Sequence, residues 1–297
     1  MIGLNHKNFE DDKYFSLHWA VSNICNYKCH YCGVYKEEKY HNFHNIIEFI
    51  NFINTIKNVD TVLFGGEPLI HPNILQIVGE LNTNIRICTN LSENELLLRE
   101  LIKINSDMKF VTSFHYEKAN FNKFFQKVLF LVEYCKLVKV KVMWDSRFKN
   151  EIKNIYELFL PLEKAYPNFK VFLDMVYHPE SDFTPEDIEY YDNIQKDKSI
   201  VIYKEDEDNE YTSYNRIRRM FNGYPNFYGW KCYVGNNGLF IDSNGDVSYC
   251  QTKKNNGKVI FNVNEDDYRD YESILYNPIV CDEDDFCTEV VMPRKKI

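Results

Sequence analysis

Three cysteines within eight residues form the part of this sequence best suited to chemistry. Cys25, Cys29 and Cys32 lie in the segment CNYKCHYC, with the spacing C-x₃-C-x₂-C. Thiolates this close repel one another unless a soft metal takes up their charge, and iron–sulfur clusters are held by cysteines in such short runs. Because a 4Fe–4S cluster has four irons, three cysteines leave one iron without a protein ligand. An open coordination position is typical of a catalytic metal rather than a structural one.

Two simpler interpretations use the same cysteines. Cys29 and Cys32 alone have the C-x-x-C spacing of a redox-active dithiol or of half a zinc site. A redox dithiol needs no third cysteine, so Cys25 argues against it. A zinc site stays open as an interpretation, because cysteines later in the chain could complete it.

A second motif, Gly65-Gly66-Glu67-Pro68, follows a short apolar run at residues 61–64. Two glycines let the backbone approach a ligand closely, because no Cβ atom intervenes. Glycine and proline also punctuate ordinary strand-to-helix turns, so the motif taken alone predicts either a binding loop or a turn.

Together, the cysteine spacing, the aromatic Tyr31 before the last cysteine and the Gly65–Pro68 motif resemble the signature of the radical S-adenosylmethionine (radical SAM) enzymes. In that family the amino and carboxylate groups of SAM chelate the open iron. The resemblance implies that Gly65, Gly66, Glu67 and Pro68 receive the SAM amino group through backbone and carboxylate. It also implies that Tyr31 packs against the adenine.

The elements that must position these motifs alternate between strands and helices. Period-two and short buried runs predict strands at 15–21, 61–64, 85–89, 110–114, 138–144 and 171–174. Helical periodicity predicts helices at 45–57, 72–81, 92–104, 121–135 and 150–165, and another from residue 184. We expect a capping box at Ser92–Glu95 to open the third helix, and an N-cap at Thr184 with Pro185 to open the last.

Six successive β/α repeats predict an α/β fold with a parallel sheet and right-handed crossovers. Six repeats rather than eight favour a partial (β/α)6 TIM-like barrel that is open at the side, which the resemblance also implies. Ligands gather at the carboxyl ends of the strands in barrels of this kind, and the cysteine loop follows the first strand.

Polar residues at the ends of the third to fifth strands are further candidates for the SAM site. The resemblance implies contacts there to the ribose and carboxylate of SAM, and the chemistry fits, since hydroxyls and carboxylates bind ribose and arginine pairs with a carboxylate. The candidates are Asn90, Ser113, His115, Asp145 and Arg147.

The character of the chain changes near residue 199, so we expect a core domain at 1–198 and a C-terminal region at 199–297. The pattern of residues 230–250, with a turn signal at Asn244-Gly245, predicts a β-hairpin that would bring Cys232 close to Cys250. Cys281 and Cys287 could complete a four-thiolate site.

This small cysteine-rich β-hairpin/helix extension resembles the SPASM extension or its shortened form, twitch, which implies a second 4Fe–4S cluster. Full SPASM extensions carry more cysteines and a further cluster, so one auxiliary cluster is the most that these cysteines allow. Structural zinc would suit the same four thiolates.

The composition and charge of the sequence indicate which partners and which cellular location the protein is expected to have. The 297 residues are 44% hydrophobic and carry a net charge of −9, which argues against nucleic acid and anionic lipid as partners. No signal-peptide pattern opens the sequence, and no apolar stretch approaches the ~20 residues that span a membrane. Nine cysteines without an export signal favour metal binding or reduced thiols and a cytoplasmic location.

The resemblance implies an enzyme that reductively cleaves SAM to a 5′-deoxyadenosyl radical, removes a hydrogen atom from a substrate and completes a net oxidation. It also implies a flavodoxin- or ferredoxin-like reductant as a partner. The substrate is a small molecule, as for a dehydrogenase, or a peptide, as for a maturase. A non-enzymatic regulatory protein that binds zinc or an iron–sulfur cluster is the alternative. No catalytic acid or base can be assigned from the sequence.

Overall fold

The computed structural model describes most of residues 15–195 and shorter parts of the C-terminal third. The described residues are 15–32, 43–56, 58–176, 181–195, 201–204, 210–212, 228–229, 231–232, 238–251, 257–263, 279–282 and 295–296. Every structural statement below concerns these residues.

Six parallel strands form the centre of the structure in chain order. They are β1 (Phe15–Ser22), β2 (Val59–Gly65), β3 (Asn84–Thr89), β4 (Lys109–Phe114), β5 (Leu137–Trp144) and β6 (Phe169–Met175). The helices between and after them are α1 (Phe43–Thr55), α2 (Ile74–Glu80), α3 (Glu95–Ile104), α4 (Phe121–Tyr134), α5 (Lys149–Ala165) and α6 (Pro185–Gln195). The predicted parallel α/β fold with six repeats is therefore confirmed.

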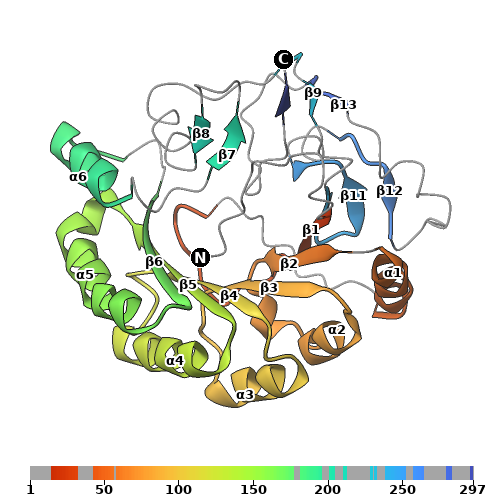
Figure 1. Ribbon diagram of the computed structural model, residues 1–297, viewed down its shortest axis with the longest axis horizontal. Coiled ribbons are helices and arrows are strands. Elements are labelled where there is room, and N and C mark those ends of the chain that lie inside the picture. Colours follow the sequence, from red (N-terminus) through yellow and green to blue (C-terminus); the bar gives the residue numbers. More distant parts are fainter. Residues whose placement is uncertain are drawn as a thin grey trace.

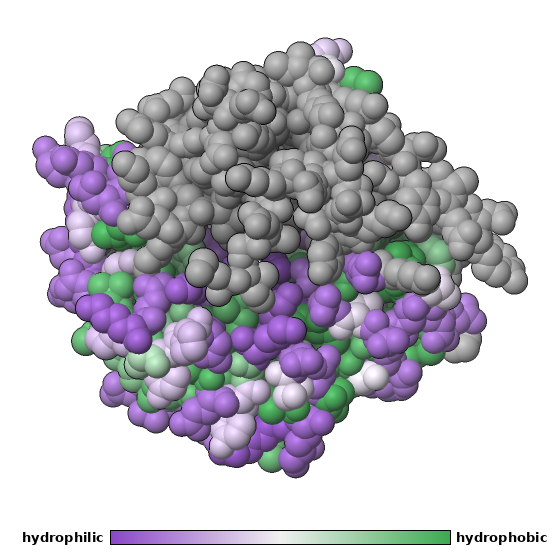
Figure 2. Space-filling view, viewed as in Figure 1, coloured by the Kyte–Doolittle hydropathy of each residue, from purple (hydrophilic) through white to green (hydrophobic). Residues whose placement is uncertain are grey.

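The sheet is curved and not closed. Its order is β12-β11-β10-β1-β2-β3-β4-β5-β6, and helices α1 to α6 lie along its outer, convex side (Figure 1). Figure 2 shows hydrophilic residues interspersed with hydrophobic ones over the part of this outer layer that it colours. None of the described helices is long and apolar enough to cross a membrane.

Strand β5 shows how side chains divide between the two faces of the sheet. Val138, Val140 and Val142 are completely buried, whereas the alternate residues Lys139 and Lys141 are partly exposed. Successive side chains of a strand point to opposite faces, so the valines pack beneath the outer helices and the lysines lie on the inner, concave face. The hydrophobic core therefore lies between sheet and helices, and the inner face is left for polar groups.

The strand following the predicted turn at Asn244-Gly245 joins the main sheet. Strands β10 (Gly238–Ile241) and β11 (Asp246–Ser248) form an antiparallel hairpin, and β10 pairs in parallel with β1. β12 (Phe261–Asn262) completes this side. The expected boundary at residue 199 lies outside the described residues, and the C-terminal region continues the sheet of the core.

The remaining described strands form two small sheets. β7 (Val201–Lys204) pairs with β8 (Glu210–Thr212), and β9 (Lys231–Cys232) lies between β13 (Ile279–Val280) and β14 (Lys295–Lys296). The predicted hairpin is thus shorter than expected, because Cys232 lies on β9 in a different sheet from β10 and β11.

The start of α3 also differs from the prediction. The helix begins at Glu95 with Asn94 as its N-cap, whose side chain accepts a hydrogen bond from Leu97 N. Ser92 lies before the helix and therefore forms no capping box. At α6 the expected cap is present, since Thr184 Oγ1 accepts the Asp187 N–H at 3.3 Å.

Candidate cofactor site

The cysteine loop leaves β1 at Ser22 and is bound to the Gly65–Pro68 motif through the backbone. Gly66 N donates to Ser22 O at 2.7 Å, and Glu67 N donates to Ile24 O at 2.8 Å. A Cβ atom on Gly66 would lie 2.1 Å from Ile24 O, and Gly65 has a φ of +128°. The two glycines are therefore required for the close approach of the motif to the start of the cysteine loop.

The Glu67 carboxylate is completely buried and turned toward β3. It accepts hydrogen bonds from Thr89 Oγ1 and Asn90 N, both at 2.6 Å, and from Leu69 N at 3.0 Å. Burial raises the pKa of Glu67 to about 7, and these hydrogen bonds oppose the shift. Glu67 thus ties the end of β2 to the end of β3 and begins the 3₁₀-helix at Pro68–Ile70.

Asn90 continues this connection to the cysteine loop. Its Nδ2 donates to Asn26 Oδ1 at 3.0 Å and lies 3.8 Å from Cys25 Sγ, while its Oδ1 accepts the Ser92 N–H at 2.9 Å. Asn26 Nδ2 in turn donates to Ser92 Oγ at 2.7 Å. Every polar atom of the Asn90 side chain therefore has a protein partner. Through Asn26 and Cys25, Asn90 connects the end of β3 to the cysteine loop.

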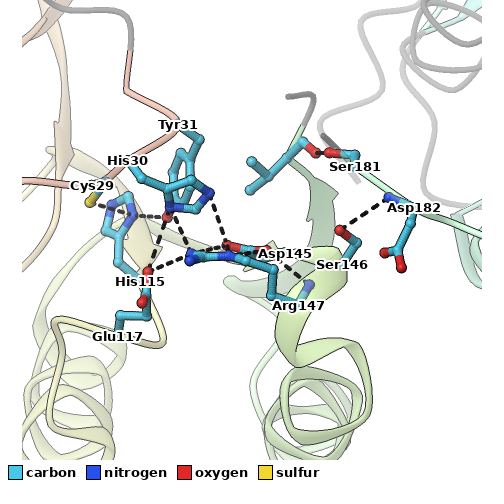
Figure 3. A network of polar contacts seen from close by, with 11 residues as sticks. Cys29, His30, Tyr31, His115, Glu117, Asp145, Ser146, Arg147, Ser181 and Asp182 are labelled. Atoms are coloured by element: carbon cyan, nitrogen blue, oxygen red, sulfur yellow. Dashed lines mark hydrogen bonds and ion pairs between the residues drawn. The ribbon is translucent and has the colours of Figure 1, made fainter. Parts of the chain in front are cut away.

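On the other side of the loop, Tyr31 and Cys29 contact His115, which follows β4. The Tyr31 hydroxyl lies 2.6 Å from His115 Nδ1, the two rings are stacked, and Cys29 Sγ lies 3.6 Å from the same nitrogen (Figure 3). Burial lowers the pKa of His115 to about 4, so the imidazole is neutral.

Arg147 lies at the centre of a second group of polar side chains, which includes His30 (Figure 3). Its guanidinium donates to Asp145 Oδ2 at 2.9 Å and to Glu117 Oε2 at 2.7 Å, and it lies 2.7 Å from His30 Nδ1. Hydrogen bonds from Arg147 lower the pKa of Asp145 against the effect of burial. Two carboxylates therefore form ion pairs with Arg147, and the group links the cysteine loop to the end of β5.

A shallow recess, open to solvent, lies between these two groups. Its lining includes Cys29, Tyr31 and His115 together with Met143 and Asp145 from the end of β5. The recess lies at the carboxyl ends of the strands, where ligands collect in parallel barrels.

The three thiols of the loop suit a metal cluster. Burial raises the pKa of Cys29, and the charges of Cys32 and Cys25 raise it further, so the thiols are close enough to repel as thiolates. An iron–sulfur cluster would remove that repulsion. Cys25, Cys29 and Cys32 are the residues that would hold such a cluster.

The residues predicted from the sequence do gather at one end of the sheet, but several make protein contacts that the sequence did not indicate. Glu67, Asn90 and Arg147 are occupied by protein partners, and Ser113 lies on the inner face of β4, beside Lys141 in the register. Asn26, Ser92 and Glu117 take part in the site and were missed. Ser92 was assigned to a cap, and a polar residue in a loop gives no other signal.

The C-terminal cysteines are only partly described. Cys232 is the register partner of Ile279, and Gly229 N donates to Cys281 O at 2.7 Å, so the backbone of Cys281 lies beside the start of β9. Cys250 follows β11, and Cys287 lies outside the described residues.

Comparison with known proteins identifies the domain that carries the site. Residues 19–146 match the sequence model described as the Radical SAM superfamily, and this range contains all three loop cysteines and the Gly65–Pro68 motif. This segment is therefore similar to the radical SAM superfamily. No curated protein matches the sequence significantly.

Two solved structures are similar in fold. SuiB from Streptococcus suis, bound to S-adenosylmethionine, shares 15% identity at a TM-score of 0.59 over 89% of this chain and 67% of its own. Native anSMEcpe with bound AdoMet and Cp18Cys peptide shares 14% identity at a TM-score of 0.56 over 87% of this chain and 80% of its own. This chain thus spans about two thirds of the length of SuiB.

Proposed function

We propose that this protein is a radical SAM enzyme that cleaves SAM reductively and oxidises a peptide or small-molecule substrate. One observation carries the proposal: the three-thiol loop is bound through its backbone to the Gly65–Pro68 motif, inside the segment that matches the radical SAM model. When bound, the cluster and SAM supply a 5′-deoxyadenosyl radical that removes a hydrogen atom from the substrate.

The protein's own residues orient and protect this chemistry. Cys25, Cys29 and Cys32 would hold the cluster, and the backbone of Gly65 to Pro68 would face the SAM amino group. Tyr31 and His115, which contact each other at 2.6 Å, form one wall of the recess where SAM would bind. Ser113, Asp145 and Arg147 remain candidates for ribose and carboxylate contacts, with Arg147 exchanging one of its present carboxylate partners for that of SAM.

The assay for this function is anaerobic SAM cleavage. Protein reconstituted with iron and sulfide should convert SAM to 5′-deoxyadenosine and methionine with dithionite, or with a flavodoxin- or ferredoxin-like reductant. Changing Cys25, Cys29 and Cys32 together to Ala should abolish the product. Cys135→Ala is the matched control, because Cys135 is buried at the end of α4, away from the site, and should leave the activity intact.

Persistent 5′-deoxyadenosine from the triple variant would contradict the proposal. Iron binding without any SAM cleavage by the wild type would favour the alternative, a non-enzymatic metal-binding protein.

A net two-electron oxidation completes the proposal. Cys232, Cys250, Cys281 and Cys287 would hold an auxiliary cluster able to accept the electron that a substrate radical must lose. SAM should then be consumed stoichiometrically, and the product should be two electrons more oxidised than the substrate. A product isomeric with its substrate, or one with an added methyl group, would refute this part alone.

The shared fold with anSMEcpe, whose structure contains a bound peptide, favours a peptide substrate. A dehydrogenase acting on a small molecule is the second candidate, since neither the recess nor its lining requires a peptide.

A further inference from the structure

The inner face of the curved sheet carries a surplus of positive charge. Along β2 to β6, the side chains that alternate with the buried core residues include five cationic and two anionic groups. These are Asp60, Arg86, Lys109, Lys139, Lys141, Lys170 and Asp174. The surplus contrasts with the whole chain, whose net charge is −9. A concave surface lined by one sign of charge attracts ligands of the opposite sign.

Most of these cations already have a carboxylate partner. Asp60 accepts from Arg86 at 2.9 Å and lies 3.4 Å from Lys109 Nζ, while Asp174 lies 2.8 Å from Lys141 Nζ. A purely structural role would leave the inner face balanced in this way, because buried charges cost free energy unless they are paired.

Lys139 and Lys170 have no such partner among the described residues, and of the two Lys139 is the less exposed. No carboxylate within ion-pair distance faces its ammonium in the described part of the chain, and its described contact is the ring of Phe172, whose centroid is 5.8 Å from Nζ. Burial, together with the charges of Arg86 and Lys141, lowers the pKa of Lys139 to about 8. The ammonium of Lys139 is therefore partly buried on this face without an ion pair to a carboxylate of the described residues.

The position of Lys139 relates it to the recess. Met143, which lines the recess with Cys29 and His115, lies on the same face of β5, four residues nearer the carboxyl end. At about 3.3 Å per residue, Lys139 lies ~13 Å and Lys141 ~7 Å deeper along the strand than Met143. The inner face is also accessible to solvent, because the side chain of Lys141 is 37% exposed and that of Arg86 is 26% exposed.

We infer that the inner face is the binding site for an anionic group of the substrate, a carboxylate or a phosphate, with Lys139 and Lys141 as its ligands. That the bound molecule is the substrate rests on the proposed function. An acidic group held by Lys139 and Lys141 would direct the rest of the molecule along β5 toward the recess. The ammonium groups act through charge and hydrogen bonding, so an uncharged isostere of the same shape should bind much more weakly.

Anion binding can be measured without SAM cleavage, so this inference and the proposed function fail separately. The full-length reconstituted protein, without reductant, is labelled with trace acetic anhydride, and acetylation of each lysine is quantified by mass spectrometry. The probes are succinate, inorganic phosphate and the neutral isostere succinamide. Lys123, exposed on α4, is the internal reference.

Succinate or phosphate should slow acetylation of Lys139 several-fold relative to Lys123 and raise the melting temperature, whereas succinamide should do neither. Stronger protection by succinate identifies a carboxylate substrate, and stronger protection by phosphate identifies a phosphorylated one. Equal acetylation of Lys139 with all three probes overturns the inference.

Variants separate binding from folding. Lys139→Met should abolish the anion-dependent rise in melting temperature, Lys139→Arg should retain it, and the control Lys123→Met should behave as wild type. Without any anion, Lys139→Met should melt at a higher temperature than wild type, because it removes a partly buried charge that has no ion pair with a described carboxylate. A lower melting temperature for Lys139→Met would show that the lysine serves the fold, and would refute its role as an anion ligand.

Discussion

Asn90 Nδ2 donates to Asn26 Oδ1 at 3.0 Å and thereby joins the end of β3 to the cysteine loop. The same residue donates its backbone N–H to Glu67 Oε2 at 2.6 Å. One residue therefore connects the two motifs that are proposed to bind the cluster and SAM. Because its Oδ1 accepts from Ser92 N, the orientation of the amide is fixed, and its Nδ2 must face the loop.

Asn90→Ala should loosen the cysteine loop without unfolding the protein. It removes the hydrogen bonds to Asn26 and Ser92, and we expect a loss of about 1–3 kcal/mol in the free energy of unfolding. The reconstituted variant should lose iron to a chelator faster than wild type and cleave SAM more slowly. Asn94→Ala is the matched control, because loss of the α3 N-cap costs about 1 kcal/mol but lies outside the site. Equal rates of iron loss in both variants would show that Asn90 does not position the loop.

Glu67 should make the stability of the protein depend on pH. Burial raises its pKa from 4.5 to about 7, so the folded protein favours the protonated carboxyl. The protonated carboxyl therefore stabilises the folded protein, by on the order of 3 kcal/mol. This stabilisation is complete below pH 4.5 and is lost as the pH rises through about 7. The melting temperature of the wild type, measured at one scan rate, should fall over this range relative to that of Glu67→Gln. Parallel pH profiles for the two proteins would contradict the assignment.

Local patterns in the sequence were sufficient to predict the six β/α repeats. Strands such as β5 alternate Val138, Val140 and Val142 with polar residues, and this period is set by burial against the helices. The position of the cysteine loop after β1 followed from the same repeats, because parallel strands place their carboxyl ends at one edge.

Contacts between distant residues could not be predicted in this way. Ser92 matches a capping box, yet Asn26, which is 66 residues earlier, binds its hydroxyl and Asn94 caps the helix instead. Cys88 lies in an apolar run, which favours a core position, but it alternates with the buried Ile87 and Thr89 and lies on the inner face. The pairing of β10 with β1 joins residues more than 200 positions apart, and no local periodicity encodes such a partner.

Lys139→Met should change stability in a different pH range from Glu67→Gln. Burial lowers the pKa of Lys139 from 10.5 to about 8, and Arg86, Lys141 and Lys109 contribute to the shift while Asp60 opposes it. The folded protein therefore favours the neutral amine, and stability present above pH 10.5 is lost as the pH falls through about 8. At pH 7 the variant should be more stable than wild type by about 2 kcal/mol, which urea unfolding of matched samples would measure. A wild type at least as stable as the variant at pH 7 would mean that the ammonium has a counter-ion.

The C-terminal cysteines should bind metal independently of the first site. Cys232 on β9 is the register partner of Ile279 on β13, and Cys281 follows β13 two residues after Ile279, while Cys250 follows a strand of the main sheet. A cluster would then fasten the small sheet to the core. We expect about eight irons in the reconstituted wild type and about four in Cys232→Ala or Cys250→Ala, since each group of thiolates binds one cluster.

These two variants should still form 5′-deoxyadenosine, because the cysteine loop and the Gly65–Pro68 motif are untouched, but they should lose the oxidised product. Cys135→Ala again serves as the control and should keep about eight irons. Stoichiometric zinc with about four irons in the wild type would show that the C-terminal site is structural. Wild-type iron content in both variants would show that Cys232 and Cys250 are not ligands, which would remove the basis for the auxiliary cluster while leaving the radical SAM site as proposed.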